Sequence, residues 1–141
     1  MLDTAQLRTE GVEEVLSIAD ACLGGLRGRS TLLIGPEEQR QLYLPLLQAA
    51  GVKNIYQEDT PIHVSELIPY VQLLISAPGP AQDRPLLTAG LVARGCLGRR
   101  TPLLIFDLSP STPSVEELAG LLPAVCLYTP EDLRHVLSKF I

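Results

Sequence analysis

Aliphatic residues gather along the chain in short runs, and segments with helical spacing separate these runs. Each run is four to six residues long and ends in glycine, proline or polar residues, which is typical of buried strands. The predicted strands cover residues 31–35, 53–56, 71–76, 102–107 and 124–128.

The segments between the strands carry apolar residues at three- and four-residue spacing and start with capping residues or prolines. Thr129-Pro130-Glu131-Asp132 is the clearest helix start, because a capping residue precedes proline and two acids. The predicted helices cover residues 9–23, 36–50, 64–70, 88–94, 115–121 and 130–139.

Strands that alternate with helices pair in parallel through right-handed crossovers, so helices cover both faces of the sheet. We therefore expect a three-layer α/β fold with a five-stranded parallel sheet. The expected strand order is 3-2-1-4-5. The order 2-1-3-4-5 stays open as the alternative, because periodicity does not separate the two.

A length of 141 residues suits one domain. We expect residues 1–25 to form an N-terminal helix that packs on a domain of residues 26–141. The polar N-terminus is unlike a signal peptide, and no apolar run reaches about 18 residues, so neither secretion nor a membrane is expected. These features predict a cytoplasmic protein.

Cys22, Cys96 and Cys126 lie far apart, so we expect three buried reduced thiols and neither a disulfide framework nor a metal site. His63 and His135 have no obvious acid or nucleophile beside them, so no catalytic residue is assigned. The net charge of −5 and the lack of a basic stripe argue against a nucleic-acid partner.

Candidate ligand contacts come from the carboxyl ends of the predicted strands, where open α/β sheets bind ligands. A rigid loop role competes with ligand binding for the residues after the third strand, and Asp107 also fits a buried carboxylate that organises its loop. The candidates are Gly35, Ser76, Ala77, Pro78, Gly79 and Asp107.

Three stretches resemble the central domain of glutamyl-tRNA reductase, the first dedicated enzyme of tetrapyrrole synthesis from glutamate. The third stretch is the most specific, because it includes Tyr128 just before an acidic helix start. Shikimate dehydrogenases, which share the architecture, are the nearest alternative relatives. The matching stretches are residues 26–35 with 50–56, residues 73–80, and residues 103–110 with 127–133.

The resemblance implies a Rossmann-like, NAD(P)-binding domain and a link to tetrapyrrole synthesis. In that family the catalytic cysteine lies in a separate N-terminal domain, and a long helical dimerisation domain follows. Neither is expected here, because only about 30 residues precede the first strand.

The predicted phosphate-binding turn departs from the family pattern. A dinucleotide fingerprint reads G-x-G-x-x-G, whereas only Gly35 of residues 35–40 is glycine. Pro36 has no N–H to donate, and Glu37 and Glu38 would each repel a phosphate by roughly 1–4 kcal/mol. We therefore expect a degraded cofactor site.

The cofactor, if there is one, stays unknown. Carboxylates follow the second strand at Glu58 and Asp59, which suits a ribose hydroxyl and opposes an extra phosphate, so NAD is easier to defend than NADP.

Three functions follow. The first is a non-catalytic, cofactor-degenerate relative of the reductase domain that binds a partner protein or an unidentified ligand. The alternatives are a small NAD(P)-dependent oxidoreductase, or a subunit of one, and an oligomeric scaffold.

Overall fold

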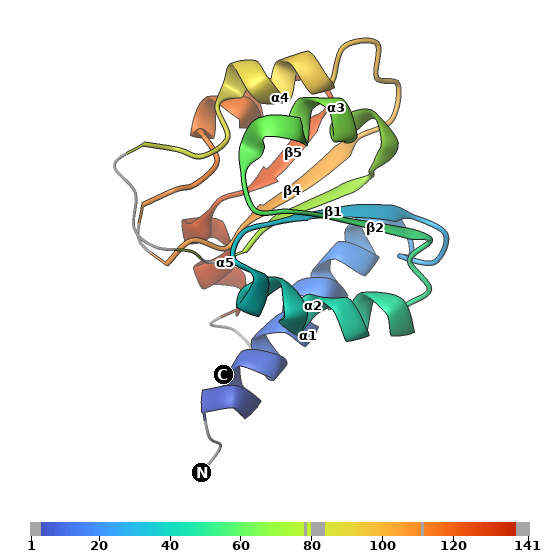
Figure 1. The fold of residues 1–141 in the computed structure, drawn as a ribbon, viewed down its shortest axis with the longest axis vertical. Helices are drawn as coiled ribbons and strands as arrows, with labels where there is room; N and C mark the ends of the chain where they lie inside the picture. The colour runs from blue at the N-terminus through green and yellow to red at the C-terminus, as the bar shows by residue number, and fades with distance from the viewer. Residues whose placement is uncertain (1–3, 78, 80–83, 111, 138–141) are drawn as a thin grey trace.

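The computed structural model describes residues 4–77, 79, 84–110 and 112–137 (Figure 1). Its strands are β1 (Ser30–Ile34), β2 (Asn54–Glu58), β3 (Leu73–Ser76), β4 (Leu103–Asp107) and β5 (Val125–Tyr128). Its α-helices are α1 (Thr4–Leu23), α2 (Glu37–Ala49), α3 (Val64–Leu67), α4 (Ala89–Gly95) and α5 (Pro130–Leu137). Three 3-10 turns are η1 (Pro61–His63), η2 (Ile68–Tyr70) and η3 (Glu117–Leu121).

All strand pairs of the sheet are parallel, which confirms the predicted α/β class. The strand order is β2-β1-β3-β4-β5, so the expected order 3-2-1-4-5 is wrong and the alternative, 2-1-3-4-5, is correct. The reason lies in the side chains of β2 and β3. Every residue of β3 is buried and needs neighbours on both sides, whereas Asn54 and Gln57 of β2 are exposed, which suits an edge strand.

Helices cover both faces of the sheet and complete the three layers (Figure 1). One face packs against α1, α2 and α5 through buried side chains such as Leu16, Leu47 and Leu133. The other face packs against α3, α4 and η3 through Val64, Val92 and other aliphatic residues. Each crossover therefore places a turn at the carboxyl edge of the sheet and another at the amino edge.

Two helix predictions need correction. The first helix starts at Thr4, so Thr9 lies inside α1 and does not cap it. Residues 115–121 form only the 3-10 turn η3, which starts at Glu117. Within the described residues, no helix has the length and apolarity that crossing a bilayer requires.

Candidate functional site

The strand order places the topological switch point between β1 and β3. The chain leaves β1 toward β2 on one side, and β3 lies on the other side. The turns after these two strands therefore face each other at the carboxyl edge, where open α/β sheets form their ligand crevice. Candidates Gly35, Ser76 and Ala77 come from these two turns.

Gly35 lies in direct contact with the turn after β3. Its φ of 138° is a conformation that L residues rarely adopt. A Cβ built on Gly35 would lie 3.1 Å from the Cβ of Ala77 and 3.2 Å from the carbonyl oxygen of Ala77. The Ala77 N–H also donates to the Ile34 carbonyl at 2.8 Å. Glycine is thus required here by the close approach of two turns.

The next residues close the crevice further. A Cβ built on Gly79 would lie 3.5 Å from Cδ of Pro36, so Gly79 packs against the proline ring. Pro36 precedes α2 with φ −59° and ψ 144° and makes no side-chain capping bond. Glu37 and Glu38, both exposed, form the first turn of α2. The helix start therefore presents a proline ring and two carboxylates.

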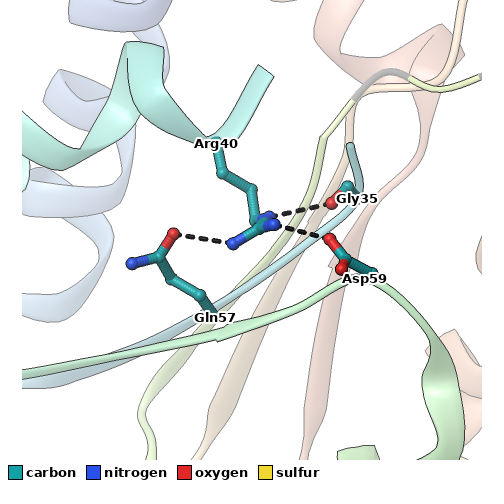
Figure 2. Close-up of polar contacts among 4 residues, drawn as sticks. All are labelled: Gly35, Arg40, Gln57 and Asp59. Carbon is teal, nitrogen blue, oxygen red and sulfur yellow. Dashed lines mark hydrogen bonds and ion pairs between the residues drawn. The ribbon is translucent and has the colours of Figure 1, made fainter. Parts of the chain in front are cut away.

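Arg40 reaches back from α2 across the end of β1 and β2 (Figure 2). Its Nε donates to the Gly35 carbonyl at 2.9 Å, and one terminal nitrogen donates to Oε1 of Gln57 at 2.7 Å. The other terminal nitrogen lies 2.5 Å from Oδ1 of Asp59 and forms an ion pair with it. The Arg40 side chain is only 10% exposed, whereas that of Asp59 is 72% exposed.

The position of Arg40 in the turn gives this network its meaning. Counted from Gly35 in the pattern G-x-G-x-x-G, Arg40 stands where the third glycine would be. That glycine allows close packing of helix and strand. Here a long cation fills the space and binds Asp59, the carboxylate placed after β2 where a ribose hydroxyl would otherwise be held.

Asp107 organises the loop after β4. The side chain is fully buried, and Oδ1 accepts from the Ser109 N–H at 3.1 Å and from its hydroxyl at 2.7 Å. Oδ2 accepts from the N–H groups of Ser114 and Val115, both at 2.9 Å. The Ser114 hydroxyl lies 3.3 Å from Oδ1 and 2.5 Å from the hydroxyl of Ser76. These bonds join β3, β4 and the following loop.

The candidates from the sequence thus divide into two groups at one edge. Gly35, Ala77 and Gly79 meet at the crevice, and Ser76 and Asp107 meet through Ser114. Pro78 lies outside the described residues. Sequence reasoning missed Arg40, although its place in the glycine pattern was a usable signal, and it missed the two serines that bind Asp107.

The cysteines and histidines form no catalytic group with these residues. Cys22 and Cys126 are exposed and Cys96 is half-buried, so the prediction of three buried thiols is wrong. Cys22 Sγ lies 3.4 Å from the hydroxyl of Tyr128, a contact that together with burial raises the pKa of Tyr128 to about 12. Nδ1 of exposed His63 lies 3.6 Å from Glu66.

The chain is similar to several glutamyl-tRNA reductases. It is 26% identical over 140 residues to that of Sulfurihydrogenibium sp. (strain YO3AOP1), which covers 86% of this chain and 31% of the relative. It is 29% identical over 142 residues to that of Methanospirillum hungatei, covering 84% of this chain and 33% of the relative. The chain spans about a third of the curated relatives it matches. No family model matches it.

Solved structures share the fold. Glutamyl-tRNA reductase from Methanopyrus kandleri aligns with a TM-score of 0.71 at 18% identity, over 94% of this chain and 37% of that one. Dipicolinate synthase from Bacillus halodurans aligns with a TM-score of 0.64 at 9% identity, over 97% and 55% of the two chains. The resemblance to a Rossmann-type domain of glutamyl-tRNA reductase is therefore confirmed.

Proposed function

We propose that this domain is a cofactor-degenerate Rossmann domain that does no redox chemistry itself and acts by binding a partner protein. The observation that carries the proposal is Arg40 at the third glycine position, bonded to Gly35, Gln57 and Asp59. The pyrophosphate and ribose of a dinucleotide would need this space and these groups.

The energetics favour the closed turn. Pro36 removes one N–H from the helix start, and the two carboxylates that follow oppose a diphosphate. A ligand would also have to replace the hydrogen bonds of a nearly buried guanidinium, and each bond to a charged group contributes about 1.5–3 kcal/mol. A micromolar ligand binds with only about 8 kcal/mol in total.

The similarity to glutamyl-tRNA reductases supports a role connected with tetrapyrrole synthesis, as a domain that docks on an enzyme of that route. The tested function is narrower: binding of a protein without binding of NAD(P).

The alternative function is a small NAD-dependent oxidoreductase or a subunit of one. A single observation favours it: Asp59 follows β2, and its side chain is 72% exposed, so it could meet a ribose hydroxyl if Arg40 moved away.

Calorimetric titration with NADH and NADPH separates the two. We expect no binding by the wild-type chain at millimolar ligand. Restoring the glycine pattern with Pro36→Ala, Glu37→Gly and Arg40→Gly should create measurable NADH binding. Because Arg40→Gly alone removes packing, a second variant, Glu37→Gln with Glu38→Gln, removes only the charge. Submillimolar binding of NADH by the wild type would overturn the proposal.

A further inference from the structure

The amino edge of the sheet differs in charge from the edge described above. The segments that lead into the strands there are residues 24–29, 50–53, 68–72, 95–102 and 121–124, all of which the structure describes. They contain no carboxylate. Their charged residues are Arg27, Arg29, Lys53, Arg99 and Arg100.

Hydrogen bonds join these segments into one continuous row that follows the strand order. The Lys53 N–H donates to the Arg29 carbonyl at 2.7 Å, which links the starts of β2 and β1. The Ser30 N–H donates to Gln72 at 2.8 Å, which links β1 to β3. The Arg99 guanidinium donates to the carbonyl of Val71 at 2.6 Å, which links β4 to β3.

The positive charges of this row are not neutralised by the protein. Arg29 and Arg99 donate to backbone carbonyls, among them those of Leu23 and Ile68, and Arg27, Lys53 and Arg100 are exposed. None of the five forms an ion pair within the part of the chain that the structure describes. A row of unpaired cations in a protein of net charge −5 is a local field of opposite sign to the whole.

Large apolar side chains stand among these cations. Tyr70 is 63% exposed, Leu97 is 80% exposed and Leu121 is 79% exposed. A shallow hollow of about 300 Å³ lies between Pro69, Leu97 and the two arginines Arg99 and Arg100. Exposed apolar groups rimmed by charge are typical of protein–protein contacts.

We propose that this amino-edge surface, made of Arg27, Lys53, Tyr70, Leu97 and Arg100, binds an acidic segment of a partner protein that also carries bulky apolar side chains. The inference rests on the proposed function, because it assigns the partner's position and chemistry. Leucines offer nothing to a phosphate backbone, so an acidic, partly apolar polypeptide fits the surface better than a nucleic acid does.

Amide chemical shifts of the labelled chain test the surface. The probe is the peptide Glu-Glu-Phe-Glu-Glu-Leu-Asp, blocked at both ends. One control peptide has lysine in place of each acid, and another has serine in place of Phe and Leu. We expect shifts at residues 27–29, 53, 69–72 and 96–101 with the first peptide, weakening as salt is added. The control peptides should shift these residues much less.

Variants sharpen the test. Arg27→Glu with Arg100→Glu should weaken binding about tenfold, and Leu97→Ser should weaken it severalfold. Arg84→Glu, which reverses an exposed cation near the opposite edge, should leave binding unchanged.

Three results would overturn the surface. Shifts confined to other residues, or none with the acidic peptide, would leave the amino edge without a partner while the lack of NADH binding could still stand. Equal binding of single-stranded oligothymidylate, insensitive to Leu97→Ser, would assign the surface to nucleic acid instead. NADH binding by the wild type would contradict the proposed function itself, whatever the peptide does.

Discussion

The two edges of the sheet use their polar groups in opposite ways. At the carboxyl edge, Arg40 and Asp107 are buried and bind groups of the protein itself. At the amino edge, Arg27 and Arg100 are exposed to solvent, as is Leu97. The same fold thus carries one edge closed by its own side chains and one edge that is open.

This difference separates fold from function. The carboxyl edge is where the architecture binds ligands in general, yet here its polar groups bind the protein and hold its loops together. A free surface with unpaired charge and exposed apolar groups has no such internal role. The amino edge is therefore the better place to search for a partner.

The largest expected effect comes from breaking the closed edge at Asp107. Asp107→Asn places an amide among N–H donors in a fully buried site, so several hydrogen bonds are lost. We expect unfolding by urea to become easier by about 3 kcal/mol or more. Asp132→Asn, at an exposed helix start, is the control and should cost about 1 kcal/mol at most. Equal losses would mean that the Asp107 network contributes little.

The second effect concerns the contact of the two crevice turns. Gly35→Ala puts a Cβ within 3.1 Å of Ala77 at a φ of 138°, and should destabilise the fold by about 2 kcal/mol. Gly90→Ala is the matched control, because Gly90 lies in α4 with open space around it. That change should stabilise by about 0.5–1 kcal/mol. Thermal unfolding measures both, and a neutral Gly35→Ala would show that the turns can separate.

Sequence patterns predicted the fold class well, because alternation of strands and helices is a local signal. The strand order was wrong in its first choice, although the signal was present. The polar side chains of Asn54 and Gln57 indicate an edge strand, and the apolar run of β3 indicates a central one. The expectation followed the usual dinucleotide-binding order instead of these residues.

The candidate site was predicted only in part, for a different reason. Turns after strands are found by counting along the chain, so Gly35, Ala77 and Asp107 could be placed at one edge. The Arg40 contacts join residues 17 and 19 positions apart through a long side chain, and no periodicity encodes them. The exposure of Cys22 depends on where the end of α1 lies against β5, which is also non-local.

The third prediction concerns the open edge. Arg99 donates to four backbone carbonyls, including Thr101 at 2.7 Å and Val71 at 2.6 Å, and only a planar guanidinium can do so. Arg99→Lys should therefore destabilise by about 1 kcal/mol, whereas Arg100→Lys should have almost no effect on urea unfolding. A neutral Arg99→Lys would mean that the amino-edge loops keep their shape without these bonds.

The smallest effect measures the positive field of the amino edge through the thiol of Cys96. Burial raises the pKa of Cys96, and the charge of Arg99 acts in the opposite direction and lowers it. In a chain with Cys22→Ser and Cys126→Ser, Arg99→Gln should raise this pKa further. At pH 8 fewer thiols are then ionised, so iodoacetamide should react about threefold more slowly, as expected for a shift of about half a pKa unit.

Arg99→Lys separates charge from packing in the same assay. Lysine keeps the positive charge near Cys96 but loses the fork of hydrogen bonds, so the alkylation rate should stay near that of the parent chain if the field sets it. If both Arg99 variants change the rate equally, the thiol responds to altered loop packing. The amino edge would then lack the persistent positive field on which its comparison with the acidic carboxyl edge depends.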